Sequence, residues 1–200
     1  LRLPIRGTKK IIVKNIKLNL IGAHNVLNSL AAVSLCLHIG IKMNVIKKSL
    51  KRFSGIQRRL TKVFQVNKRE FYDDYAHHPT EIKSVLKSFK ITSNKRKIIS
   101  VFQPHRYSRL RLLNKDFSSS FKDSDLVVLC PVYAAGEKID RKYNPFDFAK
   151  SITRNSNVQV VLVNDQKDLN NFFKKNLIEN EIVICMGAGS ISKWLREVKF

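Results

Sequence analysis

The sequence predicts an α/β protein built on a doubly wound, mostly parallel sheet. From residue 60 onwards, apolar segments of strand length alternate with longer segments of helical period. The strand-like segments, such as LVVL and VVLV, are continuously apolar, which is typical of a sheet covered on both faces. Two polar clusters, DDYAHHPTE at 73–81 and FQPHRYSR at 102–109, directly follow such segments. Open α/β sheets bind ligands at the carboxyl ends of their strands, so we expect the two clusters to form one site.

The first 59 residues predict a mainly helical region. Residues 10–17 have the mixed polarity of a strand. The segment 22–40 begins and ends with glycine and is apolar on most faces, which predicts a buried helix. A second helix is expected over 44–53 with Asn44 as its N-cap. The following residues, 55–59, then predict a hinge between two regions.

The next elements are predicted to be a hairpin and a helix. Residues 64–66 and 70–74 are strand-like, and Asn67 and Lys68 between them favour a tight turn. Pro79 suits the first turn of a helix. Apolar residues then recur at helical spacing and predict the buried side of that helix: Ile82, Val85, Leu86 and Phe89.

The remaining chain repeats the pattern of strand followed by helix. We expect strands over 97–102, 125–130, 158–163 and 181–186, and helices over 108–121, 145–152, 165–177 and 190–198.

The composition favours a soluble globular protein of the cytoplasm. Apolar segments are far shorter than the about 20 residues needed to span a bilayer. The three cysteines, Cys36, Cys130 and Cys185, are widely spaced in apolar surroundings, which favours reduced thiols over disulfides or a metal site. The formal net charge of +23 suggests nucleic-acid binding. However, the Lys and Arg residues are dispersed in short pairs, so we expect no specific nucleic-acid partner.

Two glycine-containing patterns bear on phosphate binding. The sequence contains no GxxxxGK[ST], so no Walker loop is assigned to these residues. GAGS at 187–190 follows a strand and opens a helix, but it lacks the full GxGxxG spacing and is typical of a tight turn.

Six motifs occur in a fixed order along the chain: GAHNVLNSLAA, GIQRRL, DDYAHHPTE, VFQPHRYSR, PVYAAGE and GAGSISK. Together they resemble the Mur ligase family over nearly the whole chain. The resemblance implies an ATP-dependent amide ligase of peptidoglycan synthesis, which joins L-alanine to the lactyl carboxylate of UDP-N-acetylmuramate through an acyl phosphate. It also implies that residues 1–59 are the end of the central ATP-binding domain and that residues 60–200 are the Rossmann-like last domain.

The resemblance also affects what this chain is expected to do alone. The first residue is not methionine, and the Walker loop is missing. We therefore expect a fragment of a longer protein that is inactive alone. The Mg²⁺ ligands are expected mainly in the missing part, and no metal site is expected in this chain.

Four residues are expected to contact ATP. Asn25 and Asn28 are one helical turn apart, so their amides share a face. By resemblance their partner is adenine. Arg59 can grip phosphate oxygens with its forked guanidinium. Asp74, at the end of its strand, is placed near the ribose by the family pattern.

Five residues are expected to bind L-alanine: Tyr75, His77, His105, Arg106 and Arg109. Arg106 and Arg109 lie three apart at the start of a predicted helix, whose amides should favour an anion, so one of them should clamp the carboxylate. His77 is expected to orient the amine, because histidine exchanges protons near neutral pH. We assign catalytic roles to His77, Arg106 and Arg109, and a structural role to His78.

Two alternative functions remain open from the sequence. Asp73, Asp74, His77 and His78 offer ligands for a metal-dependent phosphoesterase. The high positive charge allows a basic nucleic-acid-binding module. The oligomeric state is not predicted.

Overall fold

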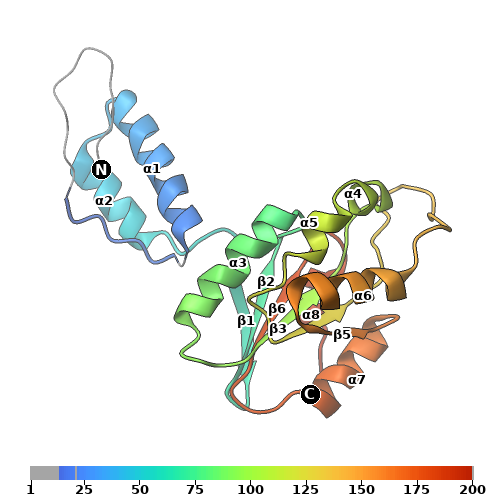
Figure 1. Ribbon diagram of the computed structural model, residues 1–200. Coiled ribbons are helices and arrows are strands. Elements are labelled where there is room, and N and C mark those ends of the chain that lie inside the picture. Colours follow the sequence, from blue (N-terminus) through green and yellow to red (C-terminus); the bar gives the residue numbers. More distant parts are fainter. Residues whose placement is uncertain (1–13, 21, 200) are drawn as a thin grey trace. The chain divides into compact units, whose positions relative to one another are not determined.

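The computed structural model describes residues 14–20 and 22–199. The chain divides into two compact units, with the boundary between Ile56 and Gln57. This boundary lies inside the segment 55–59 that the sequence predicts as a hinge. Figure 1 labels the helices and strands of both units.

The described part of the first unit contains two helices, α1 (Ala23–His38) and α2 (Met43–Arg52). Glycines flank α1 as predicted, and both adopt positive φ angles, +101° at Gly22 and +83° at Gly40. The prediction that this helix is buried is wrong for the described chain. Val33 is its one buried residue, whereas Leu27 and Leu35 are 65% and 62% exposed.

Two other predictions for the first unit need correction. Residues 14–17 form no strand, so the strand predicted over 10–17 is wrong there, and its first four residues lie outside the described residues. The second helix begins at Met43, with Lys42 at the N-cap position and no side-chain cap. Asn44 lies inside the helix instead, where its Oδ1 accepts a bond from the amide of Val45.

The second unit is built on a six-stranded sheet, and this confirms the predicted α/β, Rossmann-like fold class. The strand order is β1-β2-β6-β3-β4-β5, with β1 antiparallel to β2 and all other neighbours parallel. The strands are β1 (Thr61–Val66), β2 (Arg69–Asp74), β3 (Ile98–Phe102), β4 (Leu126–Leu129), β5 (Gln159–Leu162) and β6 (Ile182–Met186).

Helices cover both faces of this sheet and give two hydrophobic cores. One core includes residues of α3 (Pro79–Thr92), α4 (Tyr107–Leu112), α5 (Asn114–Ser118) and α6 (Pro145–Ser156). The other includes α7 (Gln166–Asn176) and α8 (Ile191–Arg196). The single helix predicted over 108–121 is divided in two, because Leu113 leaves helical geometry with φ −114° and ψ 21°. None of the helices in the described ranges is long and apolar enough to cross a membrane.

Local sequence explains how β1, β2 and α3 are arranged. Asn67 and Lys68 both have positive φ, 49° and 61°, which is the geometry of a type I′ hairpin turn. At the start of α3, His78 Nδ1 accepts from the amide of Thr80, while Glu81 accepts from the amide of His78. These bonds satisfy amides that a helix start leaves unpaired, which fits the structural role predicted for His78.

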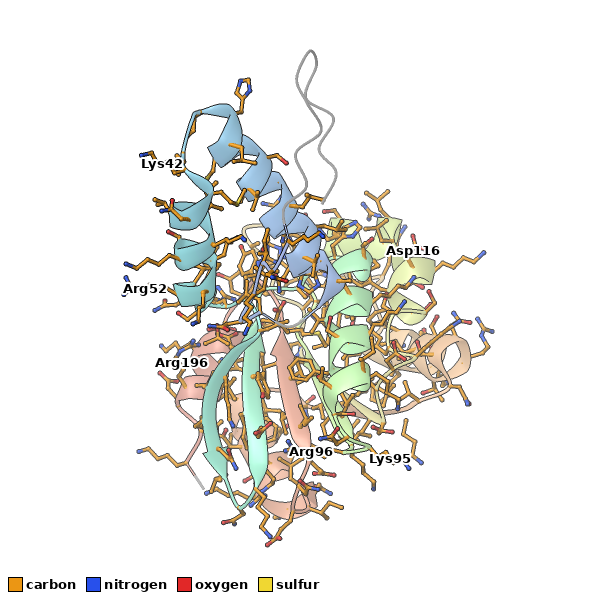
Figure 2. All side chains as sticks on the ribbon, turned by 90° about the vertical axis from the view of Figure 1, so that its left-hand side faces the viewer. Lys42, Arg52, Lys95, Arg96, Asp116 and Arg196 are labelled. Atoms are coloured by element: carbon orange, nitrogen blue, oxygen red, sulfur yellow. The ribbon has the colours of Figure 1, made fainter. Side chains whose placement is uncertain are left out.

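The two ends of the sheet differ in their hydrogen bonding. At the amino ends of the parallel strands, Arg96 donates to the carbonyls of Lys68 and Glu181, both at 3.1 Å (Figure 2). It also pairs with Glu70 at 2.9 Å. This guanidinium therefore joins loops and stabilises the fold.

At the carboxyl ends, the connections after two neighbouring strands run to opposite faces of the sheet. β6 lies between β2 and β3 in the sheet. The chain leaves β3 towards α4 on one face and leaves β6 towards α8 on the other. In doubly wound sheets, such a switch point is where ligands bind.

Candidate functional site

The loops after β2, β3 and β6 are held together at this switch point. Gly187 donates its amide to the carbonyl of Asp74 at 3.2 Å, and Gln103 donates to the carbonyl of Met186 at 3.0 Å. A Cβ on Gly187 would lie 2.8 Å from the Gln103 carbonyl oxygen, and φ there is +154°. Only glycine fits both the space and the backbone geometry. The GAGS segment thus forms the tight turn expected from its sequence.

Gln103 is a buried residue of this region whose role the sequence pattern did not reveal. It is 2% exposed, and its Oε1 accepts from the amide of Ile191 at 3.0 Å. Its Nε2 donates to Ser190 Oγ at 3.0 Å. Gln103 therefore fixes the start of α8 against the end of β3. The sequence feature that could have pointed to this role is the position of Gln103 between a predicted strand and Pro104.

Aromatic side chains from three loops form a continuous row across the strand ends. The ring centroids of Tyr75 and His77 are 5.0 Å apart, and those of His77 and His105 are 5.8 Å apart. The His105 ring then stacks on Tyr133 at 5.6 Å with an angle of 19°. The two polar clusters predicted to meet therefore lie side by side. Tyr133, from PVYAAGE, was not predicted as a site residue and is 41% exposed.

The contacts of His77 determine which ring nitrogen can accept a proton. Nδ1 lies 2.8 Å from the carbonyl oxygen of Tyr75 and 3.5 Å from a carboxylate oxygen of Glu81. Both neighbours can only accept, so Nδ1 must carry hydrogen. Neutral His77 therefore presents a bare Nε2.

Glu81 is held as a carboxylate beside His77. Burial opposes its ionisation, but a bond from the His77 amide, the charge of the His77 ring when it is protonated, and the charge of Arg59 together lower the pKa of Glu81. The carboxylate accepts that amide at 3.0 Å. Glu81 therefore fixes both the backbone and the ring orientation of His77.

His105 has the opposite arrangement of ring nitrogens. Arg109 Nη1 lies 3.4 Å from His105 Nδ1, and because a guanidinium can only donate, Nδ1 must be the acceptor. Burial lowers the pKa of His105, and the positive charges of Arg109 and Arg106 lower it further. His105 is therefore neutral near pH 7 and orients the half-buried Arg109.

Arg106 precedes α4 in a left-handed conformation with φ +70°. Its amide donates to the carbonyl of Tyr133 at 2.9 Å, and its side chain is exposed. The amides at the start of α4 bind a carboxylate of the protein itself, and their contribution to a substrate site stays a prediction. Glu137 accepts from the amide of Ser108 at 3.0 Å and from its hydroxyl, so a carboxylate of the protein already occupies that helix start. Bonds from Ser108 accordingly lower the pKa of Glu137.

The structure separates the two arginines of GIQRRL. Arg58, which was not predicted as a site residue, donates to the carbonyl of Gly187 at 2.8 Å and lies 4.6 Å above the Tyr75 ring. Arg59 lies 5.8 Å from the same ring and pairs with Glu81 at 3.4 Å. Its side chain is 52% exposed. Arg59 is therefore the more accessible cation, and Arg58 is the one that holds Tyr75.

Asp74 supports the backbone at the end of β2. Its two carboxylate oxygens accept from the amides of Leu60 at 2.8 Å and Ala76 at 2.7 Å, and the residue is 1% exposed. Burial raises the pKa of Asp74, although these two hydrogen bonds act to lower it. Its contact with ribose stays a prediction.

The two asparagines predicted to bind adenine belong to the first unit. Both lie in the first two turns of α1, with Asn25 half-buried and Asn28 exposed. Their joint role with the second unit's residues stays a prediction.

The carboxylates proposed for a phosphoesterase point in different directions. Asp73 accepts from Ser192 Oγ at 2.6 Å and from Arg196 at 2.7 Å, on the α8 side of the sheet. Asp74 bonds to backbone amides instead. Within residues 14–20 and 22–199, no three His, Cys, Asp or Glu side chains are arranged to hold a metal ion. These residues therefore do not fit the alternative function or a magnesium site.

Comparison with known proteins agrees with the fold and the motifs. Residues 58–189 match the family described as Mur ligase, glutamate ligase domain. The chain is 48% identical over 198 residues to the UDP-N-acetylmuramate–L-alanine ligase of Pelagibacter ubique, covering 99% of this chain and 43% of that protein. The ligase of the same name from Ruthia magnifica is 39% identical over 180 residues, covering 88% of this chain and 38% of that protein.

A solved structure shows the same arrangement. The crystal structure of the UDP-N-acetylmuramate-alanine ligase MurC from Thermotoga maritima superposes with a TM-score of 0.75 at 28% identity, covering 92% of this chain and 38% of that one. The chain thus spans less than half the length of these relatives. Since the family match extends over more than half of the sequence, the chain belongs to the Mur ligase family.

Proposed function

We propose that this chain supplies the amino-acid site and part of the nucleotide site of an ATP-dependent ligase of peptidoglycan synthesis. The reaction joins L-alanine to the lactyl carboxylate of UDP-N-acetylmuramate through an acyl phosphate. The relatives' names support this reaction. The single observation that carries the assignment is the row of Tyr75, His77 and His105 with Arg109 beside it at the switch point.

The carboxylate of L-alanine is proposed to bind Arg109, with Arg106 as a second cation. Guanidinium groups bind carboxylates in a bidentate geometry. Arg109 is the stronger candidate, because the neutral His105 holds its guanidinium from one side. Arg106 has an exposed side chain and can approach from the start of α4. Tyr75 and His105 complete the walls of the proposed site.

The amine is proposed to bind His77 Nε2. As the amine nitrogen attacks the acyl carbon, a C–N bond forms, the bond to the phosphate oxygen breaks and phosphate leaves. The proton released from nitrogen passes to Nε2, which is bare in the neutral ring. Holding amine and acyl phosphate together contributes up to about 7–11 kcal/mol in favourable cases.

The nucleotide is proposed to contact residues of both units. Asn25 and Asn28 would bind adenine, Arg59 the phosphates, and Asp74 the ribose. The first three belong to the proposed end of the ATP-binding domain and hinge, residues 1–59, and Asp74 to the last domain, residues 60–200. Mg²⁺ accompanies ATP in this proposal, although the described residues offer no site for it. The reaction belongs in the cytoplasm, where ATP is available.

Titration of the full chain with L-alanine, followed by NMR, tests the carboxylate assignment. The wild-type chain should show saturable shifts in the loops after β2 and β3. Arg109→Ala should weaken binding by about tenfold or more, because a charged hydrogen-bonding partner is lost. The matched control is Arg111→Ala, since Arg111 lies on the same helix but its side chain is 71% exposed and pairs with Asp140. Equal losses in the two variants, or no shifts at all, would exclude this assignment.

A further inference from the structure

A groove lies between α6 and β5. β5 is the edge strand at the opposite end of the sheet from β1 (Figure 1). Its volume is about 530 Å³. None of its residues belongs to the site proposed above. The lining combines apolar and cationic side chains: Phe146, Ala149, Lys150, Thr153, Arg154, Val160 and Leu162.

The main chain of β5 has unpaired groups on its outer side. β5 pairs with β4 and is the last strand in the order. Val163 donates to the carbonyl of Leu129 in β4, so alternate residues point their amides and carbonyls towards β4. Val160 and Leu162 therefore direct theirs outward, and no strand of the described chain pairs with them. Such an edge can accept another strand.

Proteins commonly block exposed strand edges with charged residues, proline or bulges. The β5 sequence, QVVL, contains no charged residue and no proline. Val160 and Leu162 are half-buried and line the groove. The side chain of Phe146 beside them is 64% exposed. The groove thus offers apolar contacts directly beside open main-chain hydrogen-bonding groups.

The charges of the groove select the kind of partner. Lys150 and Arg154 are one turn apart on α6 and both line the groove. In the described part of the chain, neither forms an ion pair with a carboxylate. A second copy of the chain paired through β5 would bring two such cationic pairs to one edge, which is unfavourable. The groove therefore fits an acidic partner better than it fits a second copy of this chain.

We propose that the edge of β5 and the α6 groove bind an extended acidic segment of a partner protein, which adds to the sheet as a seventh strand. Alternate side chains of a strand are about 6.6 Å apart on one face. Lys150 and Arg154 are about 6 Å apart along the helix axis. Two acidic residues at every second position therefore match the two cations, and an apolar residue two positions away reaches Phe146.

The probe for this site is a synthetic peptide, acetyl-Thr-Val-Thr-Glu-Thr-Glu-Thr-Val-Thr-amide, whose facing residues read the same in either strand direction. Titrated into the full chain, it should shift the amides of Val160 and Leu162 in NMR spectra and saturate. Lys150→Glu combined with Arg154→Glu should weaken binding about tenfold, as expected for losing two exposed ion pairs. The matched control replaces Lys174 and Lys175 by glutamate, which reverses two charges that are exposed on α7.

A second variant tests the strand pairing separately. Val160→Pro removes an amide that points outward but keeps the hydrogen bonds between β5 and β4. The variant should therefore fold but no longer bind the peptide. Equal weakening in the α7 control, or equal binding of a peptide with lysine in place of glutamate, would overturn the proposal. Concentration-dependent shifts of Val160 without peptide would also overturn it, because a second copy would then occupy the groove.

Discussion

The two units of the chain differ in how their helices begin. The three longest helices of the second unit, α3, α6 and α7, have side-chain caps from His78, Asn144 and Asp165. In the first unit, neither α1 nor α2 has a side-chain cap. The first acidic residue of the sequence is Glu70, so all 15 acidic residues lie in the second unit. The helices of the first unit therefore also lack the carboxylates that favour a helix start.

The second unit also buries more of its apolar side chains than the described part of the first unit does. The second unit encloses two hydrophobic cores, whereas α1 and α2 each have one buried residue in the described chain, Val33 and Ile46. Helices in proteins gain most of their stability from packing of an apolar face. The second unit is therefore specified by local caps and by packing together, while the described part of the first unit has little of either.

The largest expected difference between the units is in the effect of removing a leucine side chain. Leu86→Ala in α3 should lower the free energy of unfolding by about 2–5 kcal/mol, because Leu86 is fully buried. Leu27→Ala in α1 should change it by less than about 0.5 kcal/mol. Denaturant unfolding followed by the fluorescence of Trp194 reports the second unit, and circular dichroism reports both. If Leu27→Ala lowered the free energy of unfolding as much as Leu86→Ala does, the proposed difference in packing between the two units would be wrong.

A medium effect is expected from exchanging helix caps. Asp165→Ala should destabilise the second unit by about 1 kcal/mol, since Asp165 accepts from the amide of Asp168 at 2.8 Å. Lys42→Asp should increase the helix content of the first unit, because Lys42 occupies an extended N-cap position without a capping side chain. Circular dichroism at several temperatures measures both changes. Unchanged helix content in Lys42→Asp would mean that the missing cap does not limit α2.

The smallest expected effect is on the pH dependence of stability. The pKa of His105 is lowered in the folded chain from 6.5, so the unfolded chain binds a proton first as pH falls. Folding stability should therefore decrease as pH falls from above about 6.5 towards the lower folded pKa, and then level off. His105→Gln should remove this component. Parallel denaturant titrations between about pH 7.5 and 5.5 compare the two proteins, and identical slopes would contradict the prediction.

Local sequence predicted most elements of the second unit closely. Pro79 and the apolar spacing after it define α3, and the Asn67-Lys68 turn defines the hairpin. These features depend on residues near one another in the chain, which is why they could be read without a structure. The break at Leu113 could not, since it depends on how α4 and α5 pack on the sheet.

Only those parts of the site that depend on residues near one another in the chain could be predicted. The two polar clusters could be placed at strand ends from sequence alone, but the roles of Arg58, Tyr133 and Glu137 could not. Each of these contacts a residue from a distant part of the chain. Sequence order carries no direct information about such pairs.

The sequence by itself determined the fold class, the strand and helix order of the second unit, and the two clusters that meet at its switch point. Only the tertiary structure decided which side chains are available there. Adjacent residues of a strand point to opposite faces, so Asp73 bonds to α8 while Asp74 holds backbone amides. It also decided the hydrogen positions on His77 and His105, because those follow from neighbours brought together only by folding.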